Sequence, residues 1–444
     1  MKIYFIGIGG IGVSALAQYY LQKGDKVFGS DAYASEMTEM LSKLGANIVI
    51  GPQKKENISA NPAFASSSEA QYDLVIYSPA VKNDNPELME AKGRGIKCLS
   101  YPEALGEMTK EKYTIAIAGT HGKSTTTAMV ALILIKAGLD PTVVVGTKLK
   151  EFGNSNFRMG KSKYFVIEAC EHEESFLNYR PQIAVITNIE GDHLDYYKTL
   201  ENIKRAFNEF AGQVPEDGFV IKGRNAQIET KAKISNFSLE ENKEDAQKIK
   251  AILKVPGDYN ILNGLAALGV ARLLNISDEV SLMALSQFYG SWRRFDTIDL
   301  PGFTLIDDYA HHPTEIGAML ASAREKYKDK KILCVFQPHQ YQRTQFLWSD
   351  FINVFKKALA EKWVDDLILL DVYDVIGREG GDIAKNYNSK ILAEKIGEKC
   401  IYLSDSTKLE EYFSGKEVVI MMGAGNIYNL SQEIKSKYLG ACAD

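Results

Sequence analysis

Short apolar runs alternate with helical stretches along most of this chain, and the alternation restarts three times. The restarts lie near residues 1, 112 and 300, and each begins with an apolar run of strand length. Strands that alternate with helices predict parallel sheets with helices packed on their faces. We therefore expect an α/β protein of three domains, which fits 444 residues at about 150 residues per domain.

The restarts predict an N-terminal domain over residues 1–108, a central domain over residues 109–296 and a C-terminal domain over residues 297–444. The first and third are predicted to be Rossmann-like, and the central one to be a parallel sheet of the P-loop ATPase type. The predicted strands are residues 2–8, 26–30, 74–78, 96–99, 114–118, 164–168, 183–188, 303–307, 332–336, 367–371 and 418–422.

Charge and composition restrict the partners of the chain. Its 52 basic and 57 acidic residues give a formal net charge of −5, which argues against broad electrostatic binding to nucleic acid or to an anionic membrane. The sequence has no signal-peptide core, no apolar run of about 18 residues and no Cys-x-x-Cys pair. We expect a cytoplasmic protein, either a monomer or a weak homodimer, that binds neither nucleic acid nor membrane.

A glycine-rich turn, Gly7-Ile8-Gly9-Gly10-Ile11-Gly12, follows the first predicted strand and opens the first predicted helix. Its G-x-G-x-x-G spacing lets backbone N–H groups approach a diphosphate at a helix N-terminus. Asp31 ends the second strand, where a ribose-binding acid would lie. The turn predicts a nucleotide or phosphate site. The alternative is that its glycines serve only tight packing of strand against helix.

A second loop, Gly119-Thr120-His121-Gly122-Lys123-Ser124-Thr125, also joins a strand to a helix and is the stronger signal. Consecutive backbone amides can form an anion nest, Lys123 can reach terminal phosphates, and the Ser124 hydroxyl can bind Mg²⁺. The loop is shorter than the usual P-loop, because Ile117 stands where the first glycine is expected. It predicts nucleoside triphosphate chemistry, for which a plain dehydrogenase would have no use.

Four segments together resemble the Mur ligase family, the amide-bond-forming enzymes of peptidoglycan precursor synthesis. They are residues 5–15, 119–125, 307–315 and 336–339, and the resemblance extends along nearly the whole chain. It implies an ATP- and Mg²⁺-dependent ligase that joins L-alanine to the carboxylate of UDP-N-acetylmuramate through an acyl phosphate. Such an enzyme would contribute to cell-wall biogenesis, cell shape and cell division.

The remaining site residues are assigned by combining position with this resemblance. Glu168 ends an apolar strand, where an acid can hold a divalent cation. Asn260 and Asn263 share one face of a helix, where simple capping is the alternative. An exposed arginine pair such as Arg293 and Arg294 usually has no specific role on the surface. The resemblance, however, implies that Arg294 is functional.

The expected sites overlap. The UDP-sugar site comprises Gly9, Gly10, Ile11, Gly12, Ser30, Asp31, Ser78 and Ala80. ATP is assigned to the loop 119–125 with Asn260 and Arg294, and catalysis to Lys123, Glu168, His193, Asn260, Asn263, Arg294 and Asp308. The resemblance assigns Mg²⁺ to Ser124, Glu168 and His193, and the amino acid to Tyr309, His311 and Arg343. Many family members have Arg where this chain has Gln340, which removes one possible carboxylate contact.

Three alternatives remain open at this point. A related ligase would attach a preformed tripeptide to the same UDP-sugar. A nicotinamide-dependent oxidoreductase would explain the first glycine-rich turn but not the second loop. A non-enzymatic ATP-binding switch would explain the second loop but not the polar clusters at residues 308–315 and 337–344.

Overall fold

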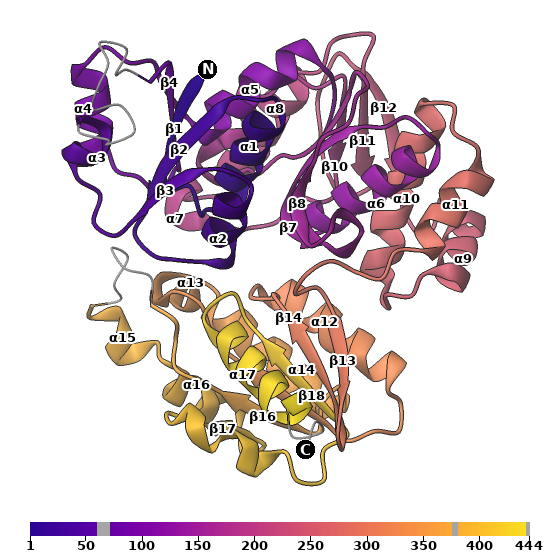
Figure 1. The fold of residues 1–444 in the computed structure, drawn as a ribbon. Helices are drawn as coiled ribbons and strands as arrows, with labels where there is room; N and C mark the ends of the chain where they lie inside the picture. The colour runs from indigo at the N-terminus through magenta and orange to yellow at the C-terminus, as the bar shows by residue number, and fades with distance from the viewer. Residues whose placement is uncertain (60–71, 375–380, 441–444) are drawn as a thin grey trace. The chain divides into compact units, whose positions relative to one another are not determined.

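The computed structural model describes residues 1–59, 72–374 and 381–440, and its strands form three sheets (Figure 1). The chain divides into two compact units. The first comprises residues 1–192, 199–249 and 262–285, and the second comprises residues 193–198, 250–261 and 286 onward. The first unit contains two of the sheets and the second contains the third, so the three-domain α/β fold is confirmed. The domain boundaries themselves remain a prediction.

The first sheet is parallel throughout, with the strand order β3-β2-β1-β4-β5. Because β1 lies between β2 and β4, the glycine-rich turn follows the central strand, at the switch point where α/β sheets bind ligands. The strands are β1 (Lys2–Ile6), β2 (Lys26–Asp31), β3 (Asn47–Ile50), β4 (Leu74–Tyr77) and β5 (Cys98–Ser100). The helices are α1 (Ile11–Gln22), α2 (Glu36–Lys43), α3 (Lys55–Ser59), α4 (Pro86–Gly93) and α5 (Tyr101–Glu111).

The second sheet has the order β12-β11-β10-β6-β9-β7-β8 and is parallel except for its last pair. Its strands are β6 (Tyr113–Ala118), β7 (Thr142–Leu149), β8 (Ser155–Arg158), β9 (Tyr164–Glu168), β10 (Ile183–Ile186), β11 (Phe219–Gly223) and β12 (Lys233–Phe237). Helix α6 (Lys123–Lys136) follows β6 directly after the phosphate loop. The predicted parallel sheet is confirmed except at this edge, where a short connection at η2 (Lys150–Phe152) turns the chain back as a hairpin.

The remaining helices of this region connect strands of the second sheet or lead from it to the third. η3 (His172–Asn178) lies between β9 and β10, and α7 (Leu194–Tyr197) and α8 (Leu200–Gly212) lie between β10 and β11. Helices α9 (Lys243–Ile252), α10 (Asp258–Leu273) and α11 (Asp278–Ser286) follow β12. Helix α9 has only two buried residues, Ala246 and Ile249, in agreement with the solvated helix that its many charges predict.

The third sheet has the order β13-β14-β18-β15-β16-β17, with β13 antiparallel to β14 at one edge. Its strands are β13 (Asp296–Leu300), β14 (Phe303–Asp308), β15 (Ile332–Phe336), β16 (Asp366–Leu369), β17 (Cys400–Tyr402) and β18 (Val418–Met422). The helices around it are α12 (Pro313–Lys326), α13 (Tyr341–Phe346), α14 (Trp348–Ala360), α15 (Ile383–Asn386), α16 (Ser389–Ile396), η4 (Ser406–Tyr412) and α17 (Ile427–Gly440).

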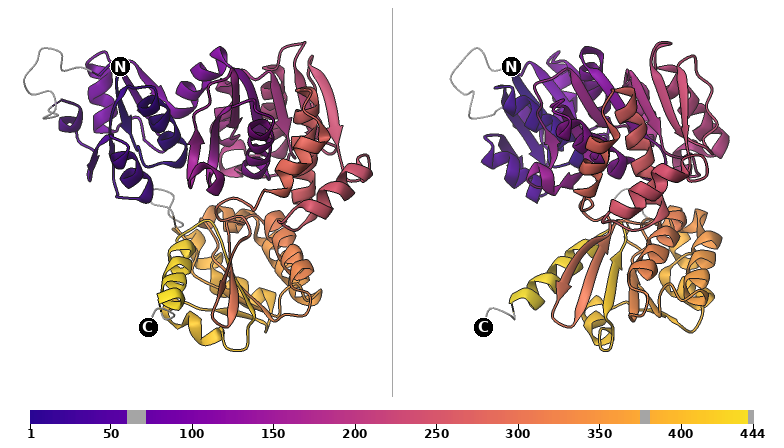
Figure 2. Two further views of the ribbon diagram at one scale, coloured as in Figure 1. Left: turned by 45° about the vertical axis from the view of Figure 1, so that its right-hand side comes forward. Right: turned by 90° about the vertical axis from the view of Figure 1, so that its right-hand side faces the viewer.

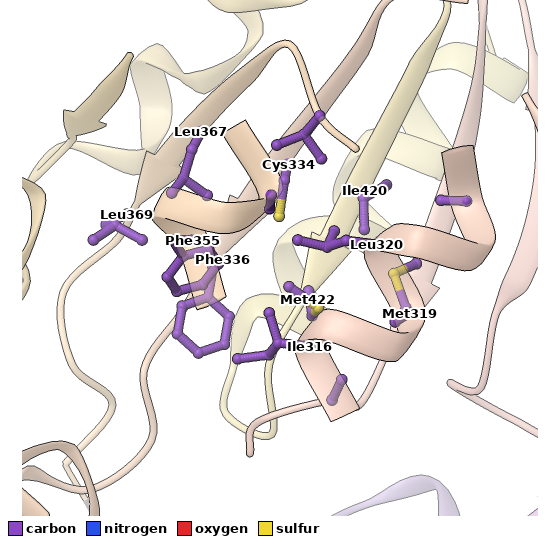
Figure 3. Packing of buried hydrophobic residues seen from close by; sticks show 14 of the residues in the cluster. Ile316, Met319, Leu320, Cys334, Phe336, Phe355, Leu367, Leu369, Ile420 and Met422 are labelled. Carbon is purple, nitrogen blue, oxygen red and sulfur yellow. The ribbon is translucent and has the colours of Figure 1, made fainter. Parts of the chain in front are cut away.

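Alternate residues of β15 enter two different cores, which explains why the strand is apolar throughout. Cys334 and Phe336 pack with helices α12, α14 and α16 on one face (Figure 3). Leu333 and Val335 pack with α17 on the other face. The yellow helix α17 and the orange helix α12 accordingly flank this sheet in Figure 2. A strand buried on both faces is expected in a parallel sheet covered by helices.

Four predicted strands end earlier than the sequence indicates. The strands predicted at residues 2–8, 74–78, 183–188 and 367–371 end at Ile6, Tyr77, Ile186 and Leu369. In each case the last predicted residues lie in the loop at the carboxyl end of the strand. Among the described helices, none has the length and apolar character that would be needed to cross a bilayer.

Candidate active site

The phosphate loop between β6 and α6 depends on two glycines with positive φ. Gly119 has a φ of +131°, and a Cβ there would lie 1.9 Å from the hydroxyl of Thr187. Gly122 has a φ of +83°, and a Cβ there would lie 2.4 Å from Oδ1 of Asn263. Both the backbone conformation and the lack of space exclude a larger residue. The two glycines therefore fix the path of the loop.

The segment after β10 holds the tip of the loop through a set of short hydrogen bonds. Asn188 accepts the His121 backbone N–H through Oδ1 at 2.9 Å and donates to its carbonyl from Nδ2 at 3.0 Å. The Thr187 hydroxyl donates to the same carbonyl at 2.6 Å. The carbonyl of Asn188 accepts the Thr120 N–H at 3.0 Å, and the Glu190 N–H donates to the Thr120 hydroxyl at 2.8 Å. The amides of Thr120 and His121 are thus engaged within the protein.

Fewer backbone amides of the loop are consequently available to bind an anion than the sequence suggests. Gly122 is the N-cap of α6, and no side chain caps the helix there. The first amides of an α-helix have no partner within the helix, and they carry the positive end of its dipole. Lys123, Ser124 and Thr125 form this first turn. The N-terminus of α6 is therefore the part of the loop that can receive phosphate oxygens.

The ammonium group of Lys123 lies under the loop. It donates to the carbonyl of Gly119 at 2.6 Å, to the carbonyl of Thr120 at 3.0 Å and to the carboxylate of Glu171 at 3.0 Å. Burial lowers the pKa of Lys123, but the Glu171 carboxylate outweighs burial, so the pKa is raised. Lys123 is therefore a charged lysine at neutral pH.

Ser124 and Glu168 offer oxygen ligands near the same loop. Ser124 is buried in the first turn of α6, and Glu168 ends β9. The Glu168 carboxylate accepts the Gly146 N–H at 2.7 Å, and a Cβ at Gly146 would lie 2.6 Å from both of its oxygens. The absence of a side chain at Gly146 leaves room for this carboxylate. Hydroxyl and carboxylate oxygens are the donors that Mg²⁺ prefers, so this donor set fits that ion.

Asn263 lies against the phosphate loop, whereas Asn260 is described within the other compact unit. Asn263 accepts from the hydroxyl of Thr126 at 3.2 Å, and both side chains are buried. The side-chain amide of Asn260 donates to the carbonyl of Pro256 at 2.7 Å. Asn263 and the predicted ATP loop belong to the same unit, and the role of Asn260 remains a prediction.

At the first glycine-rich turn, Asp31 is committed to the backbone. Its Oδ2 accepts the Gly9 N–H at 2.8 Å, and a Cβ at Gly9 would lie 2.9 Å from that oxygen. A Cβ at Gly12 would lie 2.6 Å from the ring of Tyr101. Both glycines are thus required for close packing, and Asp31 shapes the turn. This contact supports the structural alternative for part of the motif.

Ser30 is also occupied by internal contacts. Its hydroxyl donates to the buried carboxylate of Glu87 at 2.5 Å, and its carbonyl accepts the N–H groups of Gly7 and Ile8 at 2.9 and 3.0 Å. Ser30 itself is fully buried. Its carbonyl therefore holds the turn in place, and its hydroxyl is engaged by Glu87 and is not presented to a ligand.

The other predicted residues of this turn differ in their surroundings. Gly10 is the N-cap of α1 and its N–H donates to the carbonyl of Gly7 at 3.2 Å. The carbonyl of Ile11 accepts the side-chain amide of Asn156, from β8. Ala80 is exposed, and its N–H donates to the Ser78 hydroxyl at 3.3 Å.

In the second unit, Asp308 ends β14 with both carboxylate oxygens bound by backbone groups. Oδ2 accepts the Phe295 N–H and Oδ1 accepts the Ala310 N–H, each at 2.7 Å. Burial raises the pKa of Asp308 to about 6, against the opposing effect of Arg294. These contacts hold the segment before β13 to the end of β14. The catalytic role of Asp308 remains a prediction.

The adjacent residues Arg293 and Arg294 have different environments. The expectation that both side chains are exposed is wrong for Arg293. Arg293 is 4% exposed, and its guanidinium binds Asp307 at 3.2 Å and the carbonyl of Gly423 at 2.5 Å. Arg294 remains partly exposed, lies 5.2 Å from the Tyr309 ring centroid and pairs with Glu315 at 3.6 Å. Arg293 stabilises the fold, whereas Arg294 keeps a cation near the solvent.

The three residues predicted to bind the amino acid belong to one cluster within the second unit. The rings of Tyr309 and His311 lie edge to face with centroids 5.3 Å apart, and those of His311 and His339 lie 6.2 Å apart. Arg343 contacts Nδ1 of His339 at 3.2 Å. The Tyr373 ring stacks on His339 with centroids 5.5 Å apart. His339 thus links Arg343 to the other predicted residues.

His193 begins helix α7 and has a φ of +52°, an uncommon conformation for a residue other than glycine. It belongs to the second unit, whereas Ser124 and Glu168 belong to the first. Its assignment to Mg²⁺ therefore remains a prediction.

Sequence reasoning missed Glu171 and Asn188, which hold Lys123 and His121. Glu171 is one of several acids in a short stretch, and Asn188 ends a predicted strand without a motif of its own. The only available signal was their position just after central strands, where functional side chains gather in α/β sheets.

Models of the domains of one protein family match most of the chain. The Mur ligase family, catalytic domain, matches residues 2–113; the Mur ligase middle domain matches residues 117–271; and the Mur ligase, glutamate ligase domain, matches residues 293–425.

Relatives and solved structures agree with these matches. The UDP-N-acetylmuramate–L-alanine ligase of Clostridium tetani is 40% identical, with 96% of each chain covered, and that of Clostridium kluyveri is 39% identical, with 97% of each covered. The crystal structure of the UDP-N-acetylmuramate-alanine ligase of Thermotoga maritima has a TM-score of 0.79 at 29% identity, covering 99% of this chain and 100% of that one. A murein peptide ligase from Psychrobacter arcticus shares the fold, with a TM-score of 0.69 at 23% identity and 98% of each chain covered.

Proposed function

This chain belongs to the Mur ligase family, and on that premise we propose that it joins L-alanine to the carboxylate of UDP-N-acetylmuramate with the conversion of ATP to ADP and phosphate. The relatives that are about 40% identical over nearly the whole chain carry the name of this reaction. The structural observation that carries the chemistry is the N-terminus of α6, which has no side-chain cap and has Lys123 beneath it.

The reaction needs ATP because a carboxylate does not condense with an amine in water. Transfer of the γ-phosphoryl group to a carboxylate oxygen gives an acyl phosphate and ADP. The amine of alanine then attacks the carbonyl carbon, and the tetrahedral intermediate expels phosphate. Phosphoryl transfer requires positioning and charge stabilisation more than covalent help from the protein.

The residues of the phosphate loop have the properties that this step needs. The amides of residues 122–125 can receive phosphate oxygens, and Lys123 can neutralise charge on the terminal phosphates. Ser124 and Glu168 would hold Mg²⁺, which when bound spreads and neutralises the charge of the transferred group. His193 is kept as a candidate third ligand.

The other two sites are proposed from position and family membership. The turn at residues 9–12 would receive the diphosphate of the UDP-sugar, with Asp31 and the Ser78–Ala80 segment beside it. Arg343, supported by His339, would pair with the carboxylate of alanine, because a guanidinium binds a carboxylate through two parallel hydrogen bonds. A cytoplasmic monomer or weak homodimer remains the expectation from the sequence.

The test is ADP release measured with UDP-N-acetylmuramate and a panel of L-alanine, glycine, L-serine and a preformed tripeptide. We expect release to require the UDP-sugar together with an amino acid, and L-alanine to give the highest kcat/KM. Turnover with the tripeptide but not with L-alanine would favour the related peptide ligase instead. Titration with NADPH should show no binding, and binding would revive the oxidoreductase alternative.

A further inference from the structure

The three N–H donors of the Lys123 ammonium are all used inside the protein. Two donate to the carbonyls of Gly119 and Thr120, and the third to the carboxylate of Glu171. A lysine ammonium has three donors and no more. Lys123 can therefore reach a phosphate oxygen only after one of these bonds is broken.

Glu171 is the acceptor that a phosphate can best replace. Its side chain is 3% exposed, and its second oxygen lies 2.9 Å from the same ammonium. A buried cation needs a charged partner, because an unpaired charge in the interior is costly. A phosphate oxygen offers the same kind of anionic acceptor, whereas the two carbonyls belong to the loop itself.

The backbone that carries Glu171 has an unusual conformation. Glu173 and Glu174 follow with φ of +50° and +56°, two consecutive non-glycine residues in the left-handed region. Such a conformation is strained for a residue with a side chain, and it persists only where the surroundings hold it. Phe176 fixes the far end of the segment, since it is fully buried and stacks on Phe210 with centroids 4.7 Å apart. The fold thus maintains a strained turn that carries Glu171 to the lysine.

We propose that Glu171 is a positioning residue that holds Lys123 away from the triphosphate until nucleotide binds. The γ-phosphate then replaces the Glu171 carboxylate as the partner of the ammonium, so Lys123 stays paired before and after binding. This inference rests on the proposed function, because it assumes that Lys123 grips ATP. Nucleotide binding must break a buried ion pair, and Glu171 therefore weakens the affinity of the resting enzyme for ATP.

The test is the dissociation constant of Mg²⁺ with the non-hydrolysable analogue AMP-PNP, measured by calorimetry on the full chain. We expect Glu171→Gln to bind AMP-PNP about 3- to 10-fold more tightly than the unmodified protein, since the competing charge is gone. Glu173→Gln, which removes the same charge from an exposed residue two positions away, should leave the constant unchanged. Thermal unfolding checks that each variant is folded.

A second pair of variants separates this device from simple repulsion between Glu171 and the phosphates. If Glu171 acts through Lys123, Glu171→Gln should have no effect on affinity in a Lys123→Ala background. Equal or greater tightening in that background would overturn the proposal and leave repulsion as the explanation. Weaker or unchanged binding by the single variant Glu171→Gln would overturn it as well. If Lys123→Ala binds AMP-PNP as well as the unmodified protein, the phosphate grip itself fails.

Discussion

Asn188 holds the backbone of His121 from both sides, accepting its N–H at 2.9 Å and donating to its carbonyl at 3.0 Å. The two residues are 67 positions apart in the sequence. Their contact ties the phosphate loop after β6 to the end of β10, the neighbouring parallel strand. The side chain of Asn188 therefore sets the shape of a loop to which it does not belong.

Replacing Asn188 by Ala should loosen the loop and weaken nucleotide binding. The variant leaves the His121 N–H without its partner, and an unsatisfied buried group costs about 1–3 kcal/mol. We expect the KM for ATP to rise about tenfold or more, at 1.4 kcal/mol per factor of ten. Steady-state kinetics measure this change, and Asn236→Ala, at an exposed position of β12, serves as the control. An unchanged KM for ATP would contradict the role given to Asn188.

Replacing Lys123 by Ala should reduce kcat by about 10²- to 10³-fold, the usual effect of removing one group that stabilises transition-state charge. Lys136 ends the same helix and is exposed, so Lys136→Ala removes an equal charge away from the loop. Its kcat should be unaffected. Near-normal turnover of Lys123→Ala at saturating ATP would show that this lysine does not act on the phosphates.

Loss of Arg293 should mainly lower stability, whereas loss of Arg294 should mainly lower ligase activity. Arg293→Met breaks a buried pair and leaves Asp307 without its cation, a change that typically costs about 3–5 kcal/mol. Arg294→Met should keep the unfolding temperature close to that of the unmodified protein while lowering ligase activity. Denaturant unfolding and ADP release measure the two effects. The assignments fail if Arg294→Met is the destabilising variant of the pair.

The raised pKa of Asp308 predicts that the free energy of unfolding depends on pH. Burial raises the pKa of Asp308 from 3.8 to about 6, so the folded state binds its proton more tightly than the unfolded chain does. Stability contributed by this group is therefore present below about pH 4, is lost as the pH rises towards 6, and stays lost above that. A shift of this size corresponds to about 3 kcal/mol.

The measurement is the free energy of unfolding of Asp308→Asn relative to the unmodified protein between about pH 4 and 7. The variant should gain relative stability as the pH rises, because it cannot ionise. Asp350→Asn, at an exposed position of α14, provides the matched comparison for loss of an acidic charge. A relative stability of Asp308→Asn that is flat across this range would refute the raised pKa.

Replacing Arg343 by Ala should raise the KM for L-alanine and leave the KM values for the other two substrates nearly unchanged. Loss of a charge-assisted hydrogen bond costs about 1.5–3 kcal/mol, which corresponds to a rise of about 10- to 150-fold in the KM for L-alanine in Arg343→Ala. The KM values for ATP and the UDP-sugar should stay within twofold. Gln342→Ala, the exposed neighbour on α13, is the control. A comparable rise in the KM for ATP would place Arg343 outside the amino-acid site.

The fold was largely predictable because it depends on local patterns. Alternating apolar runs gave the strands at residues 332–336 and 418–422 with the bounds that the structure has. The antiparallel edge at β7 and β8 was not predicted. A local signal for the hairpin was present, because the connection contains the turn dipeptide Gly153-Asn154 and both residues have positive φ. Pairing direction itself depends on what lies beside a strand rather than on its own composition.

The sequence by itself determined which loops can bind phosphate, since glycines with positive φ and a lysine at a strand–helix junction are local requirements. Only the tertiary structure decided that Asp31 and Asp308 bind backbone amides and that the Ser30 hydroxyl binds Glu87. It also decided that Glu171 holds Lys123 and that Asn188 holds His121. A carboxylate or an amide accepts a backbone N–H as readily as a ligand. Which of the two it meets depends on segments brought together by folding, and composition and spacing do not contain that information.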